Sequence, residues 1–301
     1  MVVIDIDGLV KQYGSLTALD DVSLTVESGE VFGFLGPNGA GKSTTINILL
    51  DFVRPTAGSA RVFGMDAQEK GVAIRKRTGV LPEGYQVYER LTAREHLEFV
   101  AESKHAEMDP NAVLDRVGLG DAIDRKAGGY SKGMRQRLAL GMALVGDPDL
   151  LILDEPSTGL DPTGVKEIRD VVHEEKERGT TVFFSSHILS QVEAVCDRVA
   201  ILHEGHLAAV DTIDGLREAA GQQARMSVRG TGFTESAVDA VEALDGVTEV
   251  VSNGDLECSV EPSAKLSVLE TLEAEGVEIA DFETGDSSLE DLFMYYTEDE
   301  R

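Results

Sequence analysis

A glycine-rich turn near the N-terminus constrains the fold more than any other feature of this 301-residue chain. An apolar run at residues 30–35 precedes the turn and a helical pattern at residues 45–50 follows it, so the turn joins a strand to a helix. Glycines allow successive backbone N–H groups to converge on phosphate oxygens, and the helix adds the positive end of its dipole. The turn fits the phosphate-binding pattern GxxxxGK[ST] and comprises Gly36, Pro37, Asn38, Gly39, Ala40, Gly41, Lys42 and Ser43, with Thr44 next.

Two acids at the end of an apolar run supply the matching chemistry. Residues 150–153 predict a buried strand, and Asp154 and Glu155 follow it directly. Parallel sheets place ligands at the carboxyl ends of their strands. There Lys42 is expected to reach the β- and γ-phosphates, while the Ser43 hydroxyl and Asp154 suit Mg²⁺, the latter through water. Glu155 is expected to polarise the attacking water.

Further motifs follow in an order that resembles the ATP-binding-cassette (ABC) ATPases. The resemblance spans about residues 3–215. It implies Mg²⁺-dependent ATP hydrolysis, with two nucleotides sandwiched between two copies of the chain. The matching segments are Tyr13, the glycine-rich loop, Leu81-Pro82-Glu83, Tyr130-Ser131-Lys132-Gly133-Met134, Asp154-Glu155-Pro156, Ser157-Thr158-Gly159-Leu160-Asp161 and Ser186-His187.

The resemblance assigns a role to each remaining candidate residue. Tyr13 would stack on adenine, with a packed core aromatic as the alternative. His187 would contact the γ-phosphate and orient water, with a structural histidine as the alternative. Glu83 would ligate Mg²⁺ and Asp161 would bridge the two active sites. The signature segment Ser131, Lys132, Gly133 and Met134 would grip the γ-phosphate bound on the opposite protomer, through Ser131 and Gly133.

Two departures from the family pattern stand out. The common signature LSGGQ is here YSKGM, with Lys132 and Met134 replacing a glycine and a glutamine. The loop glutamine that usually meets Mg²⁺ and the membrane partner is here Glu83. Both variants, and the ending 288–293, resemble the drug- and polysaccharide-type exporter branch. This resemblance implies a separately encoded membrane-spanning permease as partner, a homodimer, ATP and Mg²⁺ as cofactors, and a cytoplasmic position on the inner face of the cell membrane.

The pattern of strands and helices predicts an α/β fold in two parts. Residues 1–219 are expected to form a P-loop NTPase core with an N-terminal antiparallel β subdomain and a helical insert near residues 85–132. Residues 220–301 are expected to form an α+β accessory domain of ferredoxin-like type, after a linker at 219–223. The predicted strands are 1–14, 22–26, 30–35, 150–153, 180–185, 198–203, 225–228, 247–252, 256–260 and 277–282; the predicted helices are 45–50, 93–103, 111–117, 132–145, 164–178, 189–196, 236–244, 266–274 and 288–295.

The charge balance is strongly acidic. The chain has 55 acidic and 27 basic residues, a net charge of −28, and residues 221–301 hold 20 of the acids but only 4 of the bases. Such a surface repels DNA, RNA and anionic lipid, so no nucleic-acid partner is expected. Apolar residues recur through the acidic segment, which favours folding over disorder. Surplus surface acid is typical of proteins from concentrated salt, so the chain is expected to be halophilic.

Hydropathy predicts a soluble chain, because no apolar run approaches the length that spans a bilayer. Cys196 and Cys258 lack metal-site spacing and are expected to be packed thiols. Three rival functions each have a requirement of their own. A DNA-repair cassette would need a long coiled coil between the glycine-rich loop and the signature, where only residues 45–130 lie, and a translation factor would need a second cassette, whereas the chain has one glycine-rich loop of this pattern. A GTPase would need an NKxD motif, which the sequence lacks, and a regulator without turnover would need an inert Glu155.

Overall fold

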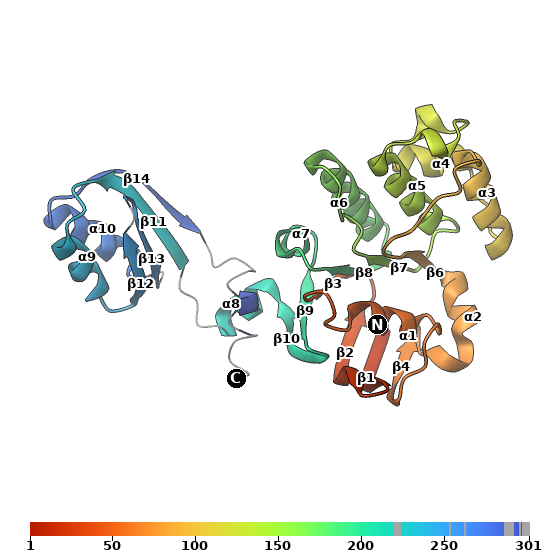
Figure 1. The fold of residues 1–301 in the computed structure, drawn as a ribbon, viewed down its shortest axis with the longest axis horizontal. Coiled ribbons are helices and arrows are strands. Elements are labelled where there is room, and N and C mark those ends of the chain that lie inside the picture. The colour runs from red at the N-terminus through yellow and green to blue at the C-terminus, as the bar shows by residue number, and fades with distance from the viewer. Residues whose placement is uncertain (220–223, 253, 262, 286–291, 295, 297–301) are drawn as a thin grey trace. The chain divides into compact units, whose positions relative to one another are not determined.

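A computed structural model divides the chain into two compact units, residues Met1–Thr212 and Ile213–Arg301. It describes all residues except 220–223, 253, 262, 286–291, 295 and 297–301 (Figure 1). The boundary predicted between residues 219 and 220 lies a few residues further along the chain. Each unit is described by itself below.

The first unit contains a six-stranded sheet in the order β10-β9-β3-β8-β7-β6. Neighbouring strands run parallel, as predicted, except that β10 is antiparallel to β9. The turn Glu204-Gly205 between those two has positive φ at both residues, the geometry of a tight hairpin. Every residue of β3, β7 and β8 is buried, as expected for strands covered on both faces. The strands are β3 (Val31–Leu35), β6 (Thr78–Leu81), β7 (Leu150–Asp154), β8 (Thr181–Ser186), β9 (Arg198–His203) and β10 (His206–Thr212).

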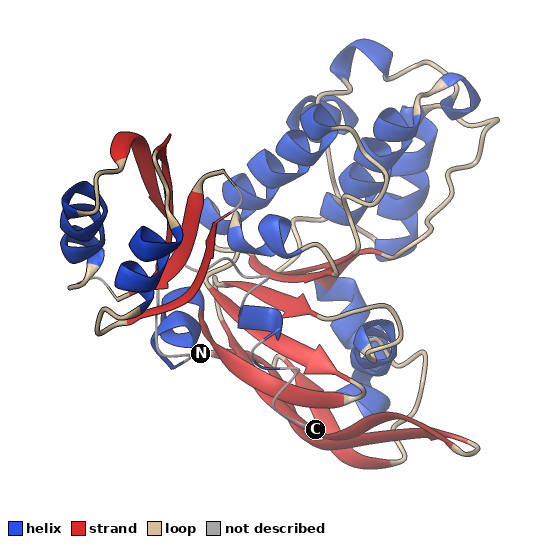
Figure 2. Ribbon diagram, turned by 60° about the vertical axis from the view of Figure 1, so that its left-hand side comes forward, coloured by secondary structure: helices blue, strands red, loops and turns tan. Residues whose placement is uncertain are grey.

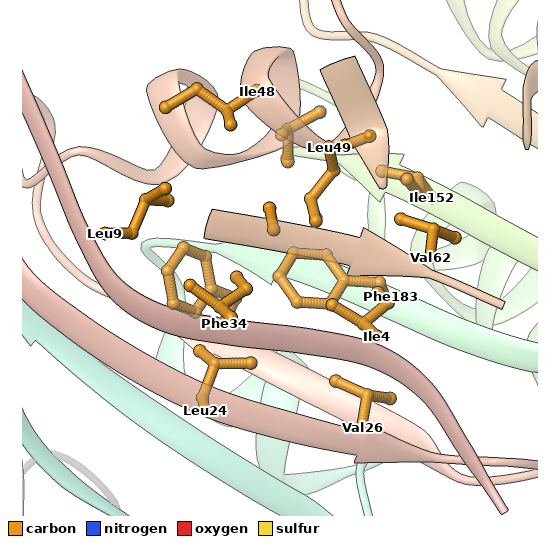
Figure 3. Close-up of a cluster of buried hydrophobic side chains, with 14 of the residues drawn as sticks. Ile4, Leu9, Leu24, Val26, Phe34, Ile48, Leu49, Val62, Ile152 and Phe183 are labelled. Atoms are coloured by element: carbon orange, nitrogen blue, oxygen red, sulfur yellow. The ribbon is translucent and has the colours of Figure 1, made fainter. Parts of the chain in front are cut away.

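An antiparallel sheet in the order β2-β1-β4-β5 packs against this sheet. Its strands are β1 (Val2–Tyr13), β2 (Leu16–Glu27), β4 (Ala57–Val62) and β5 (Met65–Asp66). Buried residues alternate along β1 and β2, so one face of the sheet is apolar. Figure 3 shows this face meeting Phe34 and Phe183 of the parallel sheet and Ile48 and Leu49 of the helix after the glycine-rich loop. The predicted β subdomain is confirmed, and it packs against the last turn of that helix.

The first unit contains the helices of the predicted insert and the helices that connect the strands of the parallel sheet. The insert predicted near residues 85–132 is confirmed, because its helices α3 and α4 gather, together with the following helix α5, on the side of the parallel strands away from the antiparallel sheet (Figures 1 and 2). Side chains cap their N-termini: Thr92 and Glu95 form a capping box on α3, and Ser131 caps α5. The helices are α1 (Lys42–Leu49), α2 (Ala67–Arg77), α3 (Ala93–Lys104), α4 (Pro110–Arg116), α5 (Lys132–Leu144), α6 (Pro162–Glu177) and α7 (Leu189–Glu193), with 3₁₀ turns at Gly120–Ala122 and Ala127–Gly129.

The second unit has the predicted ferredoxin-like order, strand–helix–strand–strand–helix–strand. Its antiparallel sheet runs β12-β13-β11-β14, and apolar residues of its two helices join the sheet in one core. The predicted helix at 288–295 falls mostly outside the described residues. The elements are α8 (Ile213–Ala219), β11 (Ala224–Thr231), α9 (Glu235–Glu242), β12 (Val247–Ser252), β13 (Leu256–Val260), α10 (Lys265–Ala274) and β14 (Glu278–Gly285).

The two cysteines are packed thiols, as expected. Both are free and they lie in different units. Burial raises the pKa of the Cys258 thiol to about 11 and raises the pKa of Cys196 well above its usual value. Among the described residues, no helix combines the length and the apolar character needed to cross a membrane.

Candidate nucleotide site

The glycine-rich loop leaves the buried strand β3 and leads directly into α1. Two of its glycines are required by the geometry. A side chain at Gly36 would collide with the carbonyl oxygen of Leu202. Gly41 has φ +114°, which other residues rarely adopt, and a Cβ there would lie 2.6 Å from the carbonyl oxygen of Ala18. The loop therefore holds a fixed backbone curve, with the first N–H groups of α1 at its end.

Lys42 lies inside this curve and is almost fully buried. Its Nζ donates to the carbonyl oxygens of Gly36 at 2.6 Å and Pro37 at 3.2 Å. The same Nζ lies 3.3 Å from Oε1 of Glu155, whose side chain is also buried. A buried ammonium needs such oxygen partners, and these three hold the charge of Lys42 within the loop.

Glu155 joins the loop to His187. Its Oε2 lies 2.8 Å from Nδ1 of His187, which follows β8, while Glu155 itself follows β7. These two strands are parallel neighbours, so their carboxyl ends bring both residues to one edge of the sheet. The backbone of Glu155 has φ +51°, an uncommon conformation for a residue with a side chain. The two residues predicted to be catalytic are therefore in contact.

The predicted magnesium ligands offer hard oxygen atoms. Ser43 and Glu83 line one cavity with Lys42 and Glu155. Asp154 is buried at the end of β7 and accepts a hydrogen bond from the Ser185 hydroxyl. A hydroxyl and two carboxylates are donors that Mg²⁺ prefers, so the residues present fit the ion.

The cavity has a volume of about 370 Å³ and an aromatic rim. Tyr13 lines it and is 47% exposed, so the alternative of a packed core aromatic is wrong. Lys11 Nζ lies 4.7 Å from the centre of the Tyr13 ring. An exposed ring beside the loop offers a flat face to a nucleobase. Of the predicted loop residues, Pro37, Asn38, Gly39, Gly41, Ser43 and Thr44 also line the cavity, while Gly36 and Ala40 are buried in the loop.

The signature residues surround a different cavity, of about 380 Å³, which Ser131, Lys132, Gly133 and Asp161 line together. Ser131 accepts a hydrogen bond from the backbone of Met134, and Asp161 caps α6 through the N–H of Gly164. A Cβ built on Gly133 would meet no atom within 4 Å, so packing inside the chain does not require this glycine. Within one chain, the signature and the glycine-rich loop therefore line separate cavities.

Sequence reasoning missed several residues of the site. Leu16 and Ala18 line the first cavity beside Tyr13, because the hairpin of β1 and β2 folds back over the loop. Ser185 holds Asp154. Its signal in the sequence was a hydroxyl directly after the apolar run 182–184, near the carboxyl end of the strand. Gln136 contacts the segment after Glu155, and no local pattern marks that contact.

Comparison with known proteins identifies this arrangement. A family model described as "ABC transporter" matches residues 19–158. The daunorubicin/doxorubicin resistance ATP-binding protein DrrA of Streptomyces peucetius is 35% identical over 98% of this chain and 92% of its own length. The chain belongs to the ABC transporter family. It is an ATP-binding subunit, as the bacitracin transport ATP-binding protein BcrA of Bacillus licheniformis also is, at 43% identity over 70% of each chain.

A solved structure shows that the similarity extends to the fold of ABC ATP-binding subunits. The structure titled as an ATP-binding subunit of an ABC transporter has a TM-score of 0.67 and 31% identity, covering 73% of this chain and 93% of its own. The similarity to DrrA runs through both units, so this ABC subunit resembles it over the accessory region as well.

Proposed function

We propose that the chain hydrolyses Mg-ATP and that Glu155 is the general base. The proposal rests on the position of Glu155 beside the glycine-rich loop. Its Oε1 lies 3.3 Å from Nζ of Lys42, and its Oε2 lies 2.8 Å from Nδ1 of His187. A carboxylate at this point can accept a proton from a water aligned with the terminal phosphate. Phosphoryl transfer needs mainly positioning and charge stabilisation, which these three residues are placed to supply.

Each other residue then has a role that its position supports. Loop N–H groups and Lys42 bind the phosphates, and Tyr13 stacks on the base. His187 holds Glu155 and orients the water. Ser43, Glu83 and Asp154 would hold Mg²⁺, which would supply positive charge to stabilise the negative charge that develops during phosphoryl transfer.

Two copies of the chain complete each other's sites. Ser131 and Gly133 line a cavity distinct from that of Lys42, which supports assigning them to the nucleotide of a second copy. A hydroxyl and a backbone N–H at a helix N-terminus are suited to a phosphate. Asp161 borders the same cavity and would bridge the two sites.

The subunit works with a separate membrane permease, and we assign it to export. The relatives DrrA and BcrA are named for drug resistance and bacitracin transport. The cassette would lie on the inner face of the membrane, bound to that permease. Residues 220–301 would serve as an accessory domain that takes no part in binding ATP.

The test of hydrolysis is phosphate release with and without Mg²⁺ over a series of protein concentrations. Because each site needs Ser131 of a second chain, the rate should rise more steeply than the protein concentration. Lys42→Ala should abolish nucleotide binding. A rate strictly proportional to protein below the dimerisation range would contradict the shared site.

The test of export uses the full transporter. The chain is co-expressed with its membrane permease, and efflux of daunorubicin or bacitracin from loaded cells is followed. Efflux that is lost in Glu155→Gln supports export. Net uptake with the parent chain would contradict it.

A further inference from the structure

A side chain of the signature helix holds the segment that carries Glu155. Gln136 lies in α5, which Ser131 caps. Its Nε2 donates a hydrogen bond of 2.8 Å to the carbonyl oxygen of Pro156, the residue directly after Glu155. One helix therefore carries a residue proposed to bind the partner's nucleotide and also contacts the catalytic segment of its own chain.

The contact matters because the backbone of Glu155 is strained. Its φ of +51° places a side chain in the left-handed region, a conformation that persists only where the surroundings fix it. Two hydrogen bonds come from the core and the loop itself: Glu155 N–H to Ser185 at 3.1 Å, and Thr158 N–H to Glu155 at 3.2 Å. The third restraint, Gln136 to Pro156, comes from α5.

The same helix is braced at further points. Arg137, the next residue, donates to the carbonyl oxygen of Gly118 at 3.0 Å and to Glu167 of α6 at 3.3 Å. Met142 lies 3.2 Å from the hydroxyl of Tyr85, which follows Glu83 in the chain by two residues. A braced helix moves as a unit, so a displacement of its N-terminus is carried to the Gln136 side chain.

We propose that Gln136 is a positioning residue that links the signature helix to the catalytic glutamate. Engagement of Ser131 with the partner's nucleotide sets the position of α5, and Gln136 then sets the peptide after Glu155 of its own chain. Closure of one site thereby aligns the base of the other. The proposal rests on the proposed ATPase function, in which Glu155 acts as base and Ser131 acts on the second copy.

The first test separates turnover from binding. Gln136→Met keeps the length of the side chain and removes the donor. It should lower kcat about ten- to a hundredfold while KM and the Kd for ATP stay unchanged, because misalignment of a reacting group affects the chemical step. Gln136→Glu keeps the shape of the side chain and replaces the donor with an oxygen. It should likewise lower kcat and leave KM and the Kd for ATP unchanged.

Gln68→Met is the matched control. Gln68 also donates from Nε2 to a backbone oxygen, that of Ile48 at 3.1 Å, away from Glu155. Its loss should leave kcat near that of the parent. Equal falls of kcat in the Gln68 and Gln136 variants, or no fall in either Gln136 variant, would overturn the proposal.

A double variant tests whether Gln136 acts through Glu155. Glu155→Gln should accumulate ATP-bound dimers, and adding Gln136→Met should leave the dimer fraction unchanged in size-exclusion chromatography. Loss of dimer would show that Gln136 supports Ser131 instead, which would overturn the proposal. A parent chain without ATPase activity would refute the proposed function, whereas an active parent with an unaffected Gln136→Met would refute only this inference.

Discussion

Oε2 of Glu155 lies 2.8 Å from Nδ1 of His187, and the two residues follow adjacent parallel strands. His187 therefore fixes the carboxylate that faces Lys42 of the glycine-rich loop. Glu155→Gln keeps the shape and removes the base, so turnover should fall by about 10²–10⁴-fold while ATP still binds. Steady-state phosphate release and equilibrium nucleotide binding measure the two effects. Near-parent turnover would move the catalytic role to another residue.

A buried ion pair joins the insert to the core. Arg116 of α4 contacts Glu175 of α6, whose side chain is only 2% exposed. Arg116→Met leaves a buried carboxylate without its main partner and should destabilise the first unit by about 3 kcal/mol or more. Urea unfolding followed by circular dichroism measures this change.

The matched control is an exposed pair. Asp124, 75% exposed, pairs with Arg94, so Asp124→Asn should change the free energy of unfolding by less than about 1 kcal/mol. If the Arg116 and Asp124 variants were equally stable, the buried pair would not hold the insert to the core.

The accessory unit should be separable. Each unit has its own hydrophobic core, and the candidate site residues all lie in the first. A chain ending at Thr212 should fold and bind ATP with the affinity of the full chain, as calorimetric titration would measure. If the shortened chain bound no nucleotide at every salt concentration tested, the first unit would need the second unit in order to fold.

The sequence predicted the parts of the site that depend on local pattern. The loop from Gly36 to Ser43 and the acids at the end of β7 were found because each follows a clear strand signal, and the loop also precedes a helix signal. The contact between Gln136 and Pro156 was not found, because it joins residues 20 positions apart through tertiary packing. The short strand β5, which has two residues, and the charged helix α2 also lacked a clear period, so they were missed.

Stability should depend on salt. The net charge is −28, and residues 221–301 hold 20 acids against 4 bases. Repulsion between carboxylates acts over about 10 Å at 0.1 M salt and about 3 Å at 1 M, so concentrated salt relieves the compact state. The melting temperature should rise, and ATPase activity with it, across a KCl series from about 0.1 M to about 3 M. A flat melting temperature with full activity at the low end would refute the halophilic prediction.

The central claim is that each active site takes Glu155 from one chain and Ser131 from the other. Glu155→Gln and Ser131→Ala are each mixed with themselves and with one another before ATP is added. Only the mixed dimer contains a site with both residues intact. Random pairing makes half of the dimers mixed, with one of two sites restored, so about a quarter of the parent rate is the upper limit for the mixture. Ser131→Ala also removes the contact that sets α5 beside the intact Glu155, so the rate should lie below that limit but above the mean of the two separate variants. The control is Glu155→Gln mixed with the double variant Ser131→Ala/Glu155→Gln, because no dimer in that mixture has an intact Glu155. A mixture whose ATPase rate equals the mean of the two separate variants would contradict the account.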